Sequence, residues 1–395
     1  MPRENGGIVG IKATATQNYA AGVFTAKTQF INNQAAMWPR SGSVFLAVAH
    51  IGSPFFSVYP FSSLGFGSRL SIPASLPAST GNAVKFSPDG KMIAVGHETT
   101  PFITAYPFSS SGIGTKYSNP GSVPAGAGDD VTFNPSSNTV AVVHASSPFV
   151  TVYPINNISG FGTKYSDPAT TPGSTGSGVD FSPDGSSIAI SCLNSPFIVV
   201  YPFSTSGFGT IYANHVSNYT TSISDAQDVA FHPSGNFISV TYVSSATSST
   251  GIERTYGFAS GSGFTSAFTD TYTEGVPTPM ASNAGNGGDA FGVAVHPSGA
   301  DVAFGVNGAS PYVRVFGFNQ STGKFATSYT NATDVPATAN RVDFSQDGNY
   351  LAAVHGTSPF ITVWPWTSGT GFGTKISNPS TLPPNTGNGV AWGRV

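Results

Sequence analysis

The sequence is poor in charge and in long apolar runs. Only 8% of its 395 residues are charged, the formal net charge is −3, and Lys and Arg form no cluster. Because nucleic-acid affinity comes largely from neutralising phosphates, we expect no nucleic-acid partner. No apolar run approaches the roughly 20 residues that a membrane helix requires, so we also expect no membrane insertion.

Cysteine is nearly absent. The single Cys192 excludes an internal disulfide and a cysteine-based metal cage, and we expect it to be a small buried apolar residue. The first residues, MPRENGGIVG, lack the basic-then-apolar layout of a secretion signal. We therefore expect a chain that is not exported by that route and that carries no cofactor and no metal.

Turn-forming and apolar residues are both abundant. The chain contains 47 Gly and 30 Pro, yet 39% of its residues are hydrophobic and 12% are aromatic. Disordered segments combine high charge with few aromatics, so this composition argues against disorder. It predicts many short strands separated by tight turns.

One phrase recurs seven times. SPFITVWPW at 358–366 matches SPFFSVYPF at 53–61, TPFITAYPF at 100–108, SPFVTVYPI at 147–155 and SPFIVVYPF at 195–203, with weaker copies IERTYGF and SPYVRVFGF. The aligned aromatics are separated by 47, 47, 48, 55, 60 and 48 residues, and they are Tyr59, Tyr106, Tyr153, Tyr201, Tyr256, Phe316 and Trp364. Each copy also contains a segment that ends in a large apolar residue, most of them before a turn such as SPDG: Phe86, Phe133, Phe181, Phe231, Val295, Phe344 and Trp392. With a β-rich run after the turn and a GFGTK-like strand after the phrase, each copy predicts four strands, the count of a propeller blade.

The side-chain pattern supports stacked blades. In TPFITAYPF, strand alternation places Phe102, Tyr106 and Phe108 on one face and Ile103 and Ala105 on the other. Both faces are apolar, as expected for a sheet packed between two neighbours. We therefore predict an all-β fold, a seven-bladed β-propeller of four-stranded blades over residues 41–395.

The two ends of this region complete one blade. NGVAWGRV at the C-terminus supplies a first strand, whereas SVFLAVAH and SPFFSVYPF supply later strands. We expect the N- and C-terminal strands to pair and close the ring, which leaves no open sheet edge between the first and last blades.

The turn F-S-P-D-G, present at Phe86–Gly90 and Phe181–Gly185, resembles the signature of WD-repeat-like propellers. The resemblance covers residues 43–395, without the Trp-Asp ending of standard WD repeats or the paired glycines of kelch blades. It implies an architecture and leaves the function open.

Residues 1–40 do not match the blade. The stretches GGIVG, YAAGVFTAKTQF and MWP resemble a short element of bacteriophage tail and fibre proteins, with matches at Ala21, Gly22, Val23, Phe24, Thr25, Trp38 and Pro39. The sequence departs from that element at Phe24, where Trp is common. The resemblance implies an attachment or oligomerisation segment, and the alternative is a disordered or strand-swapped leader.

Repeated polar residues are best explained as structural. His50, His97, His144 and His355 stand four residues before the proline of their phrase, where Cys192 and Asn307 stand in other copies. Positions repeated around a ring do not converge on one metal ion. We also expect local roles for His232 and His296 and backbone-shaping roles for the turn residues Asp89, Asp184 and Asp347.

Two long connections break the repeat, at 244–253 and 269–290. They would emerge on the same face of one blade and present aromatic, amide and carboxylate groups suited to carbohydrate: Tyr242, Asp270, Tyr272, Glu274, Asn283 and Asn286. The alternative is tolerated loop growth.

A second set of polar residues lies near the predicted first strands, which would line the central channel: Asn82, Asp129, Asp130, Asp228, Arg341 and Asn388. Sugar-lactone hydrolases that share this fold use channel-mouth carboxylates to bind a metal and act on substrate. No His or Glu accompanies the group here.

From these resemblances we predict a non-enzymatic virion protein, assembled in the host cytoplasm and acting as a tail fibre or receptor-binding component. Its partners would be other virion proteins and a host surface glycan or protein receptor, with several copies, as a homo-oligomer in the particle, giving avidity. The alternatives are a capsid decoration or tail adapter protein and a metal-dependent lactonase-like hydrolase.

Overall fold

A computed structural model describes residues 42–213, 223–244, 253–265, 290–307, 310–332 and 334–395. The chain separates into two units, Met1–Ser41 and Gly42–Val395, and the second contains all of the described structure. The described residues hold strands and turns and no helix, so none of them forms an apolar helix that could cross a membrane.

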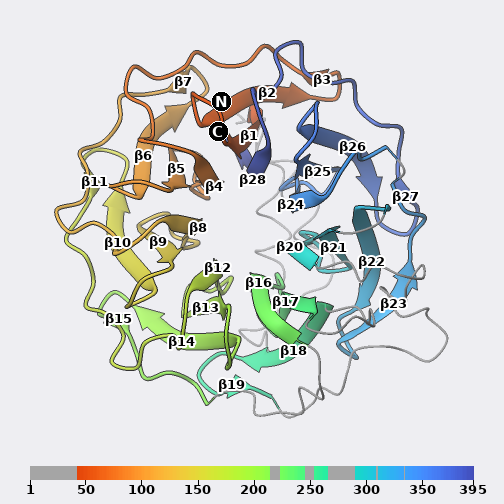
Figure 1. The fold of residues 1–395 in the computed structure, drawn as a ribbon. Helices are drawn as coiled ribbons and strands as arrows, with labels where there is room; N and C mark the ends of the chain where they lie inside the picture. Colours follow the sequence, from red (N-terminus) through yellow and green to blue (C-terminus); the bar gives the residue numbers. More distant parts are fainter. Residues whose placement is uncertain (1–41, 214–222, 245–252, 266–289, 308–309, 333) are drawn as a thin grey trace, which may run out of the picture. The chain divides into compact units, whose positions relative to one another are not determined.

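Seven four-stranded antiparallel sheets surround a central channel, which confirms the predicted propeller (Figure 1). The innermost strands are β4 (Gly81–Phe86), β8 (Gly128–Phe133), β12 (Gly176–Phe181), β16 (Ile223–Phe231), β20 (Ala290–Val295), β24 (Ala339–Phe344) and β28 (Gly387–Arg394). The second strands are β1 (Val44–His50), β5 (Met92–His97), β9 (Thr139–His144), β13 (Ser187–Cys192), β17 (Phe237–Ser244), β21 (Asp301–Val306) and β25 (Tyr350–His355).

The recurring phrase forms the third strand of each blade, as expected: β2 (Phe56–Ser62), β6 (Ile103–Ser109), β10 (Val150–Asn156), β14 (Ile198–Ser204), β18 (Glu253–Ala259), β22 (Val313–Asn319) and β26 (Ile361–Thr367). The fourth strands are β3 (Gly65–Phe66), β7 (Gly112–Ile113), β11 (Gly160–Phe161), β15 (Gly207–Phe208), β19 (Gly263–Phe264), β23 (Lys324–Ser328) and β27 (Gly371–Phe372).

Six of the seven fourth strands have two residues and are shorter than the predicted GFGTK segments. In five of these six blades a proline of the third strand accepts the last hydrogen bond of the pair, and in the sixth, that of β19, Gly257 stands at this position. In the first blade the Gly67 N–H donates to the carbonyl of Pro60 at 2.7 Å. Pro60 has no N–H to return the bond, so the ladder ends there. In the blade where Gly317 replaces this proline, β23 extends over five residues.

The core consists of seven apolar clusters between adjacent blades. Tyr106 and Phe108 pack with Phe45 of the preceding blade, whereas Ile103 and Ala105 pack toward the following blade. The prediction that both faces of the third strand are buried is therefore confirmed. The hairpin turns also form as expected, with Gly90 at φ 72°, the left-handed conformation that glycine accepts without strain.

The ring closes as predicted, because β28 pairs antiparallel with β1 in the order β28-β1-β2-β3. Val44 lies opposite Arg394, and Leu46 lies opposite Trp392. The two strands lie together in Figure 1, so the last residues of the chain provide the channel-lining strand of the first blade.

Candidate functional site

The histidines at the repeat position are structural, as predicted. His50, His97, His144 and His355 are fully buried at the end of the second strand. Each ring Nε2 lies 2.9 to 3.0 Å from a Ser or Thr hydroxyl of the third strand, on Ser57, Thr104, Thr151 and Thr362 respectively. Burial lowers the pKa of all four imidazoles to about 4. These rings are neutral links within each blade.

The pKa of these histidines predicts a specific loss of stability in acid. The imidazole pKa rises to about 6.5 on unfolding, so the unfolded chain binds a proton more readily than the folded chain. The free energy of unfolding is therefore highest above about pH 6.5 and falls as the pH is lowered toward 4. We expect His97→Gln, which can still bond Thr104, to flatten the dependence. Its free energy of unfolding should fall by about 2 kcal/mol less than that of wild type between pH 7 and 4.5.

Chemical denaturation at several pH values measures this difference. The carboxylates of the chain titrate in both proteins, so their effect cancels in the comparison. Identical pH dependence of the two proteins would show that folding does not lower the pKa of His97.

The other polar turn residues also have structural partners. The carboxylate of Asp89 accepts a hydrogen bond from the Ser87 hydroxyl at 2.6 Å, and Asp184 and Asp347 repeat this contact with Ser182 and Ser345.

His232 bonds Ser239 locally at 3.0 Å. His296 reaches farther than expected, since its Nε2 lies 3.0 Å from the Gly348 carbonyl of the next blade. Cys192 is free and buried, and burial raises the pKa of its thiol to about 12.

Tyr242 does not lie on a surface rim. It is fully buried, and its hydroxyl lies 2.7 Å from that of Tyr256. It pairs with Ala226 as His97 pairs with Gly81, so it occupies the histidine position of its blade. Its assignment to a carbohydrate site is therefore corrected. At the same position of the next blade the structure has Val306, not Asn307.

The remaining residues of that proposed site, Asp270, Tyr272, Glu274, Asn283 and Asn286, lie outside the described residues. The two long connections likewise fall largely in 245–252 and 266–289. The matched positions of the N-terminal element, including Gly22, Val23, Phe24 and Trp38, lie outside the described residues as well. Their proposed roles stay predictions.

The channel residues come together as predicted, in two cavities. The smaller cavity, of about 180 Å³, contains Asp130, Asp228 and Arg341 among its lining residues. Its residues stand further along the innermost strands than those of the other cavity, and we call it the lower cavity. The wider cavity, of about 370 Å³, is lined by Asn82, Asp129, Thr175, Ser177, Leu193, Gln227, Phe291, Asn340, Arg341 and Asn388. Arg341 lines both and connects them.

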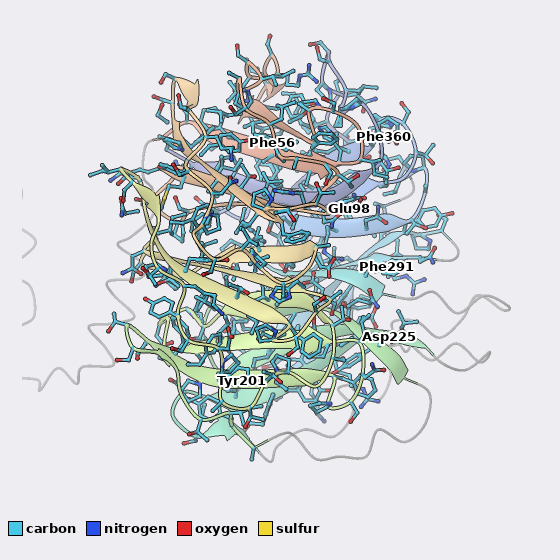
Figure 2. All side chains as sticks on the ribbon, turned by 60° about the vertical axis from the view of Figure 1, so that its left-hand side comes forward. Phe56, Glu98, Tyr201, Asp225, Phe291 and Phe360 are labelled. Atoms are coloured by element: carbon cyan, nitrogen blue, oxygen red, sulfur yellow. The ribbon has the colours of Figure 1, made fainter. Side chains whose placement is uncertain are left out.

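A repeated irregularity in the innermost strands builds the wider cavity. Between its first and third residues, each of these strands shifts register against the second strand, as between Gly81 and Ala83. In β16 the corresponding shift is between Ala226 and Asp228. Such bulges redirect a side chain. We call the seven residues at this position the channel mouth: Asn82, Asp129, Ser177, Gln227, Phe291, Asn340 and Asn388. Figure 2 shows the labelled Glu98, Asp225 and Phe291, from three different blades, toward one side of the ring.

Four of the seven mouth residues were not singled out from the sequence: Ser177, Gln227, Phe291 and Asn340. Each stands four residues before the large apolar residue that ends its first strand, as Asn82 stands before Phe86. Alignment of the repeat at this position would have found the full set.

Three asparagines of the mouth are held by the neighbouring blade. The side-chain amide of Asn82 donates to the carbonyl of Gly128 at 3.3 Å, that of Asn340 to Gly387 at 2.8 Å, and that of Asn388 to Gly81 at 3.1 Å. Each contact uses an N–H group. The amide oxygens are therefore left to accept hydrogen bonds from a ligand.

Four aspartates deeper in the channel connect adjacent blades. In each, Oδ2 accepts a hydrogen bond from a backbone N–H on the innermost strand of the following blade: Asp130 from Val179, Asp180 from Phe231, Asp228 from Val293 and Asp343 from Trp392, at 2.8 to 3.0 Å. The innermost strand is a sheet edge with unpaired donors, and charged acceptors bond such donors strongly. These carboxylates primarily hold the ring together.

Burial raises the pKa of three of the four bridging aspartates, Asp130, Asp180 and Asp343. Burial, with repulsion from Asp228, raises the pKa of Asp130 to about 6, and burial raises that of Asp180 to about 7. Burial disfavours the charged form of Lys85, but the nearby carboxylates, Asp343 first, outweigh it and raise the pKa of the ammonium. Lys85 therefore stays charged inside the lower cavity.

Asp129 differs from the four bridging aspartates. It is half-buried in the mouth, and no described residue donates a hydrogen bond to it. Burial, reinforced by repulsion from Asp130, raises the pKa of its carboxyl to about 6, against the opposing attraction of Arg341. Near neutral pH it is an ionised carboxylate that can take up a proton.

Arg341 is fixed beside the mouth. Its Nη1 donates to the carbonyls of Phe291 at 2.8 Å and Asn340 at 3.1 Å, and its Nε lies 3.7 Å from Asp228 Oδ2. Gly292 permits this approach, because a Cβ there would lie 2.8 Å from the Arg341 Cα. The Nη2 group has no hydrogen-bond partner in the described part of the chain and can donate to a ligand.

No group of three or more His, Cys, Asp or Glu side chains within the described ranges is arranged to hold a metal ion. The bridging aspartates instead face backbone N–H groups. The described residues therefore do not fit the metal-dependent version of the hydrolase alternative.

Comparison with known proteins identifies the fold but not a family. No protein-family model matches the chain, and no curated protein matches it. Among solved structures, a provisionally assigned 6-phosphogluconolactonase from Bacteroides uniformis has a TM-score of 0.64 at 15% identity, covering 89% of this chain and 100% of its own. The periplasmic gluconolactonase of Pseudomonas aeruginosa has a TM-score of 0.64 at 13% identity, covering 89% and 99%.

The propeller also resembles a domain with a different name. The Myceliophteria thermophila Cps50 (Swd1) β-propeller domain has a TM-score of 0.52 at 10% identity, covering 79% of this chain and 90% of its own. This agrees with the expected likeness to WD-repeat-like propellers.

These findings correct the predicted function. The chain was expected to be a non-enzymatic bacteriophage component, but three of the matched structures are named for lactonases and a fourth for a hydrazine synthase. None of the matched structures named here is a phage protein, and the resemblance of residues 1–40 to tail and fibre proteins receives no support.

Proposed function

We propose that the chain is a hydrolase that opens the ring of a sugar lactone at the channel mouth. The observation that carries this proposal is Asp129, an unbonded, half-buried carboxylate that shares a cavity of about 370 Å³ with Arg341. The likeness to structures named for lactonases supports the same reaction class, as analogy.

Hydrolysis requires a base, an anion-stabilising donor and groups that orient the sugar. Asp129 would accept a proton from a water molecule, whose oxygen forms a bond to the lactone carbonyl carbon. The negative charge that develops on the carbonyl oxygen would be stabilised by the guanidinium of Arg341, through Nη2. The carbon–ring-oxygen bond then breaks, and the leaving ring oxygen takes the proton from Asp129, giving the open hydroxy acid.

The neighbouring residues would position this reaction. Asp228 and two backbone carbonyls hold the guanidinium of Arg341, so the donor is already oriented when substrate enters. The fixed amides of Asn82, Asn340 and Asn388 offer oxygens to the sugar hydroxyls. Phe291 offers a ring on which the C–H face of a sugar can stack.

The raised pKa of Asp129 predicts the pH dependence of the activity. A general base acts in its deprotonated form, so kcat/KM should be constant above about pH 6 and fall about tenfold per pH unit below it. Acid release from glucono-1,5-lactone in a pH-stat, corrected for spontaneous hydrolysis, measures the profile. A kcat/KM that does not change between pH 7 and 4.5 would exclude Asp129 as the base.

A further inference from the structure

The channel carries more acidic than basic groups, and this bears on which lactone can enter. The side chains that line the two cavities include five carboxylates, Asp129, Asp130, Asp180, Asp228 and Asp343, and two cations, Lys85 and Arg341. Counted as fully ionised, these groups carry a formal charge of −3. The raised pKa of Asp130, Asp180 and Asp343 makes the lower cavity less negative than that count, so the carboxylate that bears most directly on a ligand at the mouth is Asp129. The exposed carboxylate of Glu98 adds to the negative field at Asp129.

Neither cation is available to a phosphate group, because the one unpaired group of Arg341, Nη2, is the donor assigned above to the lactone carbonyl oxygen. Arg341 already faces Asp228 and two backbone carbonyls. Lys85 lines only the lower cavity, where the charges of four aspartates stabilise its ammonium group. It stands three residues beyond Asn82 on β4, about 10 Å further along the channel at about 3.3 Å per strand residue.

Binding a phosphate group requires more cationic or backbone N–H groups than the mouth cavity offers. Proteins bind phosphate with clustered Arg or Lys side chains, a helix N-terminus or a nest of backbone N–H groups. The described residues include no helix, and of the residues that line the mouth cavity only Arg341 is a cation. The other polar groups there are neutral amides and hydroxyls and one carboxylate.

Building on the proposed function, we propose that the channel mouth takes an uncharged sugar lactone and discriminates against its phosphorylated form. The amides of Asn82, Gln227, Asn340 and Asn388 match hydroxyl groups, and Phe291 matches a sugar face. Asp129 repels a second anion, since like charges brought together at a binding site weaken binding.

Parallel kinetics on glucono-1,5-lactone and its 6-phosphate test this inference. At pH 7 and low ionic strength we expect kcat/KM to be about 10- to 100-fold higher for the uncharged lactone, mainly through KM. The ratio should shrink as salt is added, because salt screens the repulsion. A higher kcat/KM for the phosphate would overturn this inference while leaving the proposed hydrolase intact, whereas hydrolysis of neither lactone would contradict both.

A matched pair of variants separates charge from shape. Gln227→Lys adds a cation at the mouth, and Gln227→Met gives an uncharged side chain of similar length. Relative to Gln227→Met, the lysine variant should raise the ratio of phosphate to uncharged hydrolysis about tenfold. Equal ratios in the two variants would show that charge at the mouth does not select the substrate.

Discussion

Replacement of Asp129 by Asn is expected to lower kcat/KM for glucono-1,5-lactone about 10²- to 10⁴-fold, the usual contribution of a general base. Asn is nearly the same size and keeps the amide-lined character of the mouth, but it cannot take a proton from water. Since Asp129 has no hydrogen-bond partner among the described residues, its removal breaks no link between blades.

Stability should even rise slightly in this variant. The pKa of Asp129 is raised in the folded chain, mainly by burial, so its charged form opposes folding above about pH 6. Asp167→Asn, which removes an exposed carboxylate outside the channel, is the matched control for net charge and should keep wild-type kcat/KM. Unchanged kcat/KM in Asp129→Asn, with a melting temperature equal to or above that of wild type, would remove Asp129 from the mechanism.

The second large effect concerns the closure of the ring. Trp392 lies in the terminal strand β28, only 4% exposed, with its ring 4.9 Å from that of Phe61. Its backbone N–H donates to Asp343 Oδ2 at 2.9 Å, and its indole Nε1 donates to the Asp343 carbonyl at 3.0 Å. This residue therefore joins the last blade to the one completed by both ends of the chain.

Trp392→Ala should lower the free energy of unfolding by about 3–5 kcal/mol, the usual cost of removing a buried indole. Trp392→Phe is the matched control, because Phe occupies this position in five blades, as in Phe86 and Phe133. The control keeps an aromatic ring in the cluster and loses one hydrogen bond, for a cost of about 1 kcal/mol. Denaturant unfolding with an unchanged m-value measures both, and equal, small losses would mean that ring closure contributes little.

Much of the fold follows from the sequence because the repeat contains its own evidence. Seven copies of one phrase, apolar on both faces, require sheets stacked between neighbours, and NGVAWGRV requires a partner near residue 43. Errors arose where local chemistry overrides the repeat. Pro60 ends the pairing of the fourth strand in the first blade. Tyr242 is buried at the histidine position of its blade, although the sequence predicts it to be part of a carbohydrate site.

The channel site was only half predictable. Charged residues such as Asp129 and Arg341 attract attention in a sequence so poor in charge, and the structure places both in one cavity. Phe291 and Gln227 look ordinary until the bulge of each inner strand is seen to turn that position toward the channel. The predicted function rested on a short resemblance outside the propeller, and no contact in the described structure bears on that segment.

The most direct test of the proposed function is the rate of acid release from glucono-1,5-lactone with and without the purified chain at pH 7. The account predicts a rate that is proportional to protein concentration, saturates with substrate and is lost in Asp129→Asn. A rate equal to spontaneous hydrolysis, from a chain that unfolds cooperatively, would contradict it.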